Sequence, residues 1–273
     1  MPSRSDTRRV FVARGLCCAA ALGLGCRRFE SEADARELRV FAASSLREAF
    51  SELGREFERT HAGVRVVFNF AGTQELRTQL EHGASADVFA SADPQHAREL
   101  LALQRILSPR SFARNEPVVV VSRRAQVAVR AFVELPLAAR VVLGTPEVPI
   151  GRYSAQILER ANQQLAADFR ARVEARVVSR ELNVRQVLAK VSLGEADAAI
   201  VYRTDAIAAG EQVRIVPIPP ELNVIAEYPI AVAADSTEPG LAAQWVNLVR
   251  SATGRKVLMA VGFLAPEAPP HPL

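Results

Sequence analysis

Several positions in this chain lie where an apolar run meets a helical pattern, and each offers hydrogen-bond donors without a formal charge. Ser45 and Thr73 bring hydroxyls, Tyr202 brings a phenol, and the segments 149–151 and 183–184 bring backbone N–H groups at predicted helix starts. The first turn of a helix leaves N–H groups unpaired and carries a partial positive charge, so it attracts anions. We therefore predict an anion site that needs no charged side chain.

The stretch 181–206 gives the clearest pattern of this kind. Asn183 is suited to a helix N-cap and Gln186 follows three residues later, which makes a capping box. Apolar residues then recur at helical spacing until Gly194, and an apolar strand over 198–201 leads to Tyr202. The helix start and the tyrosine hydroxyl can face the same space.

Three other junctions repeat the arrangement. Ser45 follows a predicted strand and forms a capping box with Glu48, while Thr73 opens a helix after Gly72, where backbone can approach a ligand closely. The segment 149–151 precedes a helix that we expect to begin near Tyr153. Ligands of α/β proteins collect at the carboxyl ends of strands, where such junctions lie.

Purely structural roles compete with this interpretation, because serine, threonine and asparagine commonly cap helices and a single tyrosine is often a core residue. Arg152 and Arg185 lie beside the proposed site positions and are further candidates for contact with an anion. For Asp87 and Asp93, which flank a short strand, we expect turn or cap roles.

Strand and helix patterns alternate along the body, which predicts α/β units with parallel sheets covered on both faces. We expect one lobe over 37–116 plus 230–265, a second lobe over 120–226, and a flexible tail over 266–273. Strands over 117–121 and 228–233 are candidates to cross between the lobes. Two crossings would form a hinge, with the ligand in the cleft between the lobes.

The first 28 residues have the parts of an export signal, which predicts a location in the periplasm or at the extracytoplasmic surface of the membrane. The pair Arg8-Arg9 with Phe11 resembles a twin-arginine signal, and the apolar run over 15–25 is too short to span a bilayer. Cys26 ends a segment that resembles a lipoprotein cleavage site and is a candidate for lipidation. An ordinary secretory signal is the alternative.

The net charge of +4 over 273 residues comes from this leader, so we expect no nucleic-acid partner. All three cysteines lie in it, and the four histidines are scattered, so we expect neither a cation site nor a cofactor. The sequence shows no serine–histidine–acid trio or paired carboxylates, so we expect no enzyme activity.

The body resembles a periplasmic molybdate-binding protein, the solute receptor of a molybdate ABC transporter. Matching segments run in family order across nearly the whole body: FAASSL (41–46), FAGTQEL (70–76), GASADVFASAD (83–93), NEPVVV (115–120), GTPEVPIGRYS (144–154), NVRQVLAKVSLGEADAAIVYRTDA (183–206) and EYPIAV (227–232). Thr73 stands where family members often have serine, and Asn183 where many have an acidic residue.

The resemblance implies a two-lobed periplasmic binding fold of type II, with two doubly wound α/β lobes joined by a two-strand hinge. It also implies that the oxyanion is held by the hydroxyls of Ser45, Thr73 and Tyr202 and by backbone N–H groups near Ile150 and Val184. The expected ligand is molybdate or tungstate, and the expected partners are the permease subunits of an ABC transporter with its ATPase. We expect a monomer.

The chemistry of these anions agrees with a site made only of donors. Molybdate and tungstate are fully deprotonated tetrahedral dianions near neutral pH, so every oxygen accepts hydrogen bonds, whereas hydrogen phosphate needs an acceptor for its proton. Sulfate or another tetrahedral oxyanion remains an alternative ligand, which cavity size must reject. A ligand-sensing domain or an enzyme on the same fold is the alternative from a different class.

Overall fold

Two five-stranded sheets, each with helices on both faces, make up the part of the chain described by the computed structural model, residues 36–126 and 129–267. Both sheets lie in one compact unit, residues 34–273. The predicted export signal, Cys26 and nearly all of the predicted tail lie outside the described residues. Within those residues, no helix combines the length and apolar character that a membrane span requires.

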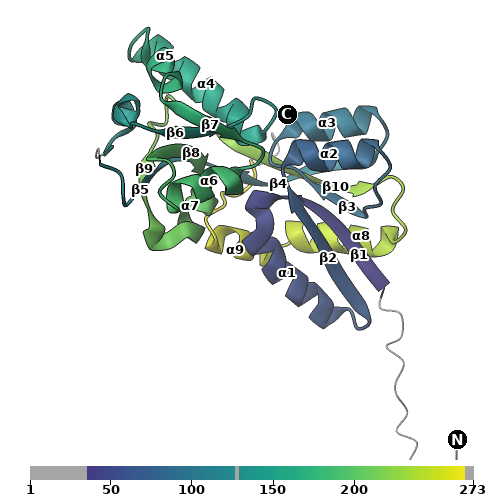
Figure 1. Cartoon of the computed structure of the whole chain (residues 1–273). Coiled ribbons are helices and arrows are strands. Elements are labelled where there is room, and N and C mark those ends of the chain that lie inside the picture. Colours follow the sequence, from purple (N-terminus) through teal and green to yellow (C-terminus); the bar gives the residue numbers. More distant parts are fainter. Residues whose placement is uncertain (1–35, 127–128, 268–273) are drawn as a thin grey trace, which may run out of the picture. The chain divides into compact units, whose positions relative to one another are not determined.

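The first lobe, shown with its helices in Figure 1, contains the sheet with strand order β2-β1-β3-β10-β4. Its strands are β1 (Arg36–Ala43), β2 (Val64–Ala71), β3 (Val88–Ala90), β4 (Ile106–Asn115) and β10 (Ala226–Ala233). Its helices are η1 (Ser44–Leu46), α1 (Arg47–Thr60), α2 (Thr73–Glu81), α3 (Pro94–Ala102), α8 (Pro239–Arg250) and α9 (Ala252–Ala260). Helices α2 and α3 cover one face of this sheet, and α1, α8 and α9 cover the other (Figure 1).

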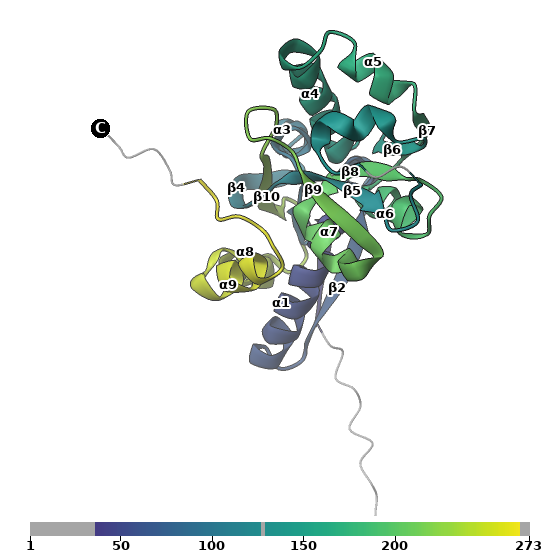
Figure 2. The ribbon, with the colours of Figure 1, turned by 90° about the vertical axis from the view of Figure 1, so that its left-hand side faces the viewer.

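The second lobe contains the sheet with strand order β7-β6-β8-β5-β9. Its strands are β5 (Pro117–Ser122), β6 (Val141–Gly144), β7 (Val177–Glu181), β8 (Ala198–Tyr202) and β9 (Val213–Pro217). Its helices are η2 (Phe132–Leu137), α4 (Pro149–Gln164), α5 (Phe169–Glu174), α6 (Val184–Ser192), α7 (Arg203–Ala209) and η3 (Gly210–Gln212). Figure 2 shows this lobe above the helices α1, α8 and α9 of the first.

The chain passes between the lobes twice, but neither candidate crossing strand is shared by the two sheets. β4 ends at Asn115 and β5 begins at Pro117 in the other sheet, and the return runs between the end of β9 at Pro217 and the start of β10 at Ala226. The prediction of parallel sheets was only partly right. β1 is parallel to β2 and β3, and β6 to β7 and β8. However, β10 is antiparallel to β3 and β4, and β5 is antiparallel to β8 and β9. The strand that follows each crossing, β5 or β10, runs antiparallel to its neighbours, so both sheets are mixed.

The core explains why these segments became central strands and packed helices. The β5 residues Val118–Val121 and the β8 residues Ala198–Val201 are apolar runs buried on both faces of their sheet. In the first lobe, Trp245 of α8 makes edge contacts with Phe50 and Phe57 of α1, at ring distances of 5.5 and 5.6 Å. The C-terminal helix α8 thereby packs against α1 in the first lobe.

Candidate functional site

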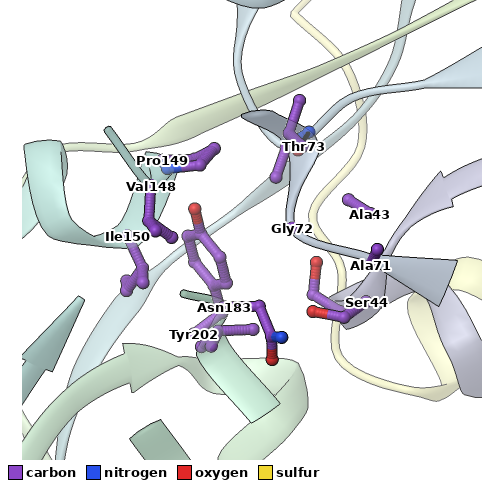
Figure 3. A pocket seen from close by; sticks show the side chains of 13 residues that line it. Ala43, Ser44, Ala71, Gly72, Thr73, Val148, Pro149, Ile150, Asn183 and Tyr202 are labelled. Atoms are coloured by element: carbon purple, nitrogen blue, oxygen red, sulfur yellow. Dashed lines mark hydrogen bonds between the residues drawn. The ribbon is translucent and has the colours of Figure 1, made fainter. Parts of the chain in front are cut away.

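A small cavity, partly open to solvent, lies between the two lobes. The close-up in Figure 3 shows side chains from both lobes around it. The structure brings all five predicted site residues to its wall: Ser45, Thr73, Ile150, Val184 and Tyr202. Its other lining residues are small, apolar or neutral polar, so no charged side chain lines this cavity.

Four helices begin at the cavity wall. η1 starts at Ser44 and α2 at Thr73 in the first lobe, while α4 starts at Pro149 and α6 at Val184 in the second. The first-turn N–H groups of a helix have no acceptor within the helix and carry the positive end of its dipole. Helix ends from both lobes therefore direct partial positive charge toward one small space.

Helix α4 begins earlier than the predicted start near Tyr153, and this difference creates its contribution to the site. Pro149 occupies its first position, where a fixed φ favours helix initiation and the missing N–H costs nothing. Ile150 therefore lies in the first turn. Gly151 is required here because a Cβ at that position would collide with the Thr145 carbonyl at the end of β6.

The predicted capping box of Ser45 with Glu48 was wrong. The short helix η1 intervenes between β1 and α1, so α1 is preceded by Leu46 and has no side-chain cap. The Ser45 hydroxyl is 2% exposed and lies 2.9 Å from the hydroxyl of Tyr228 on β10. Because Ser45 caps no helix, its hydroxyl is available at the cavity wall.

Thr73 occupies the first position of α2, after the N-cap residue Gly72. Its Oγ1 accepts a hydrogen bond of 3.2 Å from the backbone N–H of Ala92. The Gly72 φ is −62°, so its backbone would permit other residues. A Cβ there would instead lie 2.5 Å from the Leu182 carbonyl oxygen of the second lobe, which shows how closely the two lobes approach.

The predicted N-cap of α6 is confirmed. The Asn183 Oδ1 accepts a hydrogen bond of 3.1 Å from the Gln186 N–H, while the Gln186 side chain accepts from the N–H of Leu182. Asn183 also lines the cavity, next to Val184. Its side-chain oxygen is committed to the cap, so the donors that this helix start offers are N–H groups, chiefly those of the first-turn backbone.

Tyr202 ends β8, and its ring lies among the cavity residues with the hydroxyl directed away from its own strand (Figure 3). The residue is 1% exposed, and its hydroxyl has no hydrogen-bond partner within the described residues. Burial raises the pKa of Tyr202 well above its usual value of 10, so the phenol stays protonated. A buried donor without a protein acceptor suits a ligand that supplies one.

The two candidate arginines lie outside the cavity lining and are paired. Arg152 of α4 forms an ion pair with Asp93, which also caps α3 by accepting from the His96 N–H. Arg185 of α6 pairs with Glu48 across the lobe boundary, and its Nε lies 2.8 Å from the buried Asp205. These arginines join elements around the site and have little free charge to offer an anion.

Asp87 has the structural role that we expected. Its carboxylate accepts hydrogen bonds from the backbone N–H groups of Arg39 and Glu238 and from the Ser236 hydroxyl. It therefore ties β1 to the loop that precedes α8.

Sequence reasoning missed two residues at this site. Ser44 lines the cavity beside Ser45, and the consecutive serines of FAASSL were the available signal. Tyr228 lies behind Ser45, and its position in the matching segment EYPIAV gave no indication of that contact. Among the described residues, no group of three or more histidine, cysteine or acidic side chains is placed to hold a metal ion.

The sequence profile of the bacterial extracellular solute-binding proteins matches residues 38–264 of this chain. The chain belongs to this family. Relatives include the molybdate-binding protein ModA of Mycobacterium tuberculosis, which is 38% identical over 235 residues, covering 85% of this chain and 86% of ModA. The predicted resemblance of this solute-binding protein to molybdate-binding proteins is confirmed.

Solved structures confirm the predicted α/β fold of periplasmic binding proteins. The periplasmic molybdate-binding protein of Azotobacter vinelandii matches with a TM-score of 0.72 at 20% identity, covering 84% of this chain and 100% of that one. The sulfate-binding protein SubI of Mycobacterium tuberculosis matches with a TM-score of 0.74 at 20% identity, covering 85% and 88%. At these identities the likeness concerns the fold and leaves the ligand open.

Proposed function

We propose that this solute-binding protein captures molybdate or tungstate in the cavity between its lobes and delivers it to the permease of an ABC transporter. The observation that carries the proposal is the meeting of four helix N-termini and the hydroxyls of Ser45, Thr73 and Tyr202 at one small cavity without a charged side chain. The names of its relatives support the choice of molybdate.

A tetrahedral dianion suits such a wall because each of its oxygens can accept several hydrogen bonds. A hydrogen bond to a charged group contributes about 1.5–3 kcal/mol, and preorganised helix ends add favourable electrostatics without a counter-charge. A cation would face the positive ends of four helix dipoles and no anionic ligand. Hydrogen phosphate would bring a proton to a wall that has no carboxylate to accept it.

The donors are divided between the lobes, so binding and closure are coupled. Ser45 and Thr73 come from the first lobe, and Ile150, Val184 and Tyr202 come from the second. The lobes also bond directly: the Gln74 side chain donates to the Leu182 carbonyl at 2.6 Å. A ligand that contacts donors of both lobes stabilises this closed arrangement.

Calorimetric titration of the purified protein with molybdate, tungstate and sulfate tests the proposal. We expect tight binding of molybdate or tungstate and a raised melting temperature, since ligand at a thousandfold excess over its dissociation constant adds about 4 kcal/mol to the free energy of unfolding. No thermal shift with either anion at millimolar concentration would refute the proposal. Tighter binding of sulfate than of molybdate would favour the alternative of a sulfate receptor.

A second test separates ligand contact from helix capping. Ser45→Ala should weaken molybdate binding and lower the melting temperature of the ligand-free protein only moderately, because Ser45 caps no helix and its loss leaves the Tyr228 hydroxyl without this partner. A large loss of ligand-free stability with unchanged affinity would mean that the hydroxyl is structural.

Export and anchoring complete the proposed role. We infer that the leader carries the chain out of the cytoplasm by the twin-arginine or the general route, and that Cys26 is the point of lipid attachment. The protein then works as a monomer at the outer face of the membrane, beside its permease. Cell fractionation of the wild type and of Cys26→Ser tests the anchor, because only the wild type should partition with membranes.

A further inference from the structure

A buried chain of polar groups runs from the lobe crossing to the anion cavity. Asn115 ends β4 just before the chain passes to the second lobe, and its side chain reaches the hydroxyls of Thr204 and Tyr228. Tyr228 in turn contacts the hydroxyl of Ser45, which lines the cavity. Asn115, Thr204, Tyr228 and Ser45 are all buried, so their polar atoms depend on one another for hydrogen bonds.

The directions of these hydrogen bonds follow from the orientation of the Asn115 amide. Its Oδ1 accepts from the backbone N–H of Glu116 at 3.0 Å, and a backbone N–H can only donate. The Asn115 Nδ2 must therefore face the other two groups, and its two N–H bonds point to Thr204 Oγ1 at 2.9 Å and to the Tyr228 oxygen at 3.4 Å.

The Tyr228 oxygen thus accepts from Asn115, and its own proton needs an acceptor. Within the described residues, its remaining partner at hydrogen-bond distance is Ser45 Oγ at 2.9 Å. The nearby hydroxyl of Tyr202 interacts electrostatically with Tyr228 but lies outside hydrogen-bond geometry. Burial raises the pKa of Tyr228 well above 10, so the phenol keeps its proton and donates it. Ser45 Oγ then accepts a hydrogen bond from Tyr228, so the single proton of Ser45 can be donated to a ligand in the cavity.

Thr73 repeats this arrangement by other means. Its Oγ1 accepts from the backbone N–H of Ala92, so its proton is also free for the cavity. The hydroxyls of Ser45 and Thr73 are therefore each supplied with a donor from the protein side and present a donor to the ligand.

We propose that Tyr228 and Asn115 are specificity-determining positioning residues that fix the Ser45 hydroxyl as a donor, so that the cavity favours fully deprotonated tetrahedral oxyanions over protonated ones. This inference rests on the proposed function and adds the groups that decide the proton direction. Without Tyr228, the Ser45 hydroxyl can rotate so that its oxygen accepts a hydrogen bond from the O–H of a protonated ligand. The discrimination against hydrogen phosphate should then fall.

The test compares Tyr228→Phe with the wild type by calorimetry, using molybdate and, at mildly alkaline pH, singly protonated phosphate. We expect molybdate binding to weaken about tenfold, the order of one hydrogen bond to a charged group. The ratio of molybdate affinity to phosphate affinity should fall with it. Tyr153→Phe is the control, since it removes the hydroxyl of another buried tyrosine, which hydrogen-bonds to the Glu227 backbone and not to Ser45, and it should leave this ratio unchanged.

A double-mutant cycle shows whether Tyr228 acts through Ser45. In the Ser45→Ala background, Tyr228→Phe should change molybdate affinity less than about twofold, because the hydroxyl it orients is absent. An equal effect in both backgrounds, or an unchanged affinity ratio in Tyr228→Phe, would overturn the inference. If Tyr228→Phe does not fold, Asn115→Ala takes its place with the same expected loss of selectivity.

The two proposals fail in different ways. A wild-type protein that binds sulfate and not molybdate would overturn the proposed function. The cycle of Ser45→Ala and Tyr228→Phe, measured with sulfate, would then still decide whether Tyr228 directs the Ser45 proton.

Discussion

Replacing Tyr202 by phenylalanine should move ligand affinity and protein stability in opposite directions. The substitution removes one oxygen from a side chain that is 1% exposed and whose hydroxyl has no hydrogen-bond partner in the described structure. In the ligand-free protein this hydroxyl is a buried donor that costs free energy, whereas with an oxyanion bound it becomes a charge-assisted donor. The ring contacts with Tyr153 and Tyr228, at 6.4 and 5.8 Å, are retained by phenylalanine.

The expected magnitudes follow from this asymmetry. Loss of a hydrogen bond to a charged acceptor costs about 1.5–3 kcal/mol, which corresponds to a dissociation constant raised about 10-fold to 150-fold. Removal of an unpaired buried hydroxyl should leave the free energy of unfolding of the ligand-free protein unchanged or raise it by up to about 1–3 kcal/mol. Calorimetric titration with molybdate gives the first quantity, and denaturant unfolding without ligand gives the second.

Tyr153→Phe is the control for ring chemistry, because it removes a hydroxyl from the neighbouring tyrosine of the same aromatic row. It should affect molybdate binding much less than Tyr202→Phe. The reasoning would be refuted if Tyr202→Phe bound molybdate as the wild type does. It would also be refuted if the ligand-free variant lost stability, because the hydroxyl would then have a structural partner.

Three further changes test other parts of the site. Thr73→Val keeps the side-chain shape and removes the hydroxyl, so molybdate affinity should fall about 10-fold or more. The free energy of unfolding should also fall, because the buried Ala92 N–H loses its acceptor. If neither value changed, the role of the Thr73 hydroxyl as a ligand donor would be contradicted. Burial raises the pKa of Asp205 from 3.8 to about 7, so the folded protein holds a proton between these values that the unfolded chain has released. The wild-type free energy of unfolding should therefore fall as pH rises through this interval, by up to about 1.4 kcal/mol per pH unit more than that of Asp205→Asn; parallel pH profiles from denaturant unfolding would contradict this. Glu48→Gln breaks the ion pair with Arg185 across the lobes, and because Glu48 is 38% exposed we expect the ligand dissociation rate to rise less than about fivefold. Glu52→Gln, whose ion pair stays within α1, should have no such effect in stopped-flow measurements, and equal effects would exclude a role of the lobe contact.

The sequence determined the local elements and the location of the donors. Asn183 with Gln186 marked the start of α6, and the apolar run before Tyr202 marked a buried central strand, because capping and hydrophobic burial act over a few neighbouring residues. Ordering these junctions along the chain selected Ser45, Thr73, Tyr202 and the segments 149–151 and 183–184, and the family resemblance narrowed these segments to Ile150 and Val184. All five residues line one cavity. The family resemblance added the expectation of an oxyanion.

Only the tertiary structure decided how these donors are oriented and what surrounds them. Ser45 lost its predicted capping role because η1 separates β1 from α1, and it gained Tyr228, which lies 183 positions further along the chain. The sequence suggested Arg152 and Arg185 as possible contacts of an anion. In the structure, each forms an ion pair with an acidic residue of the first lobe. Such partners are brought together by sheet order and lobe closure, and neither leaves a periodic pattern in the sequence. The direction of a hydroxyl proton depends on these distant partners, whereas the presence of the hydroxyl depends only on the residue itself.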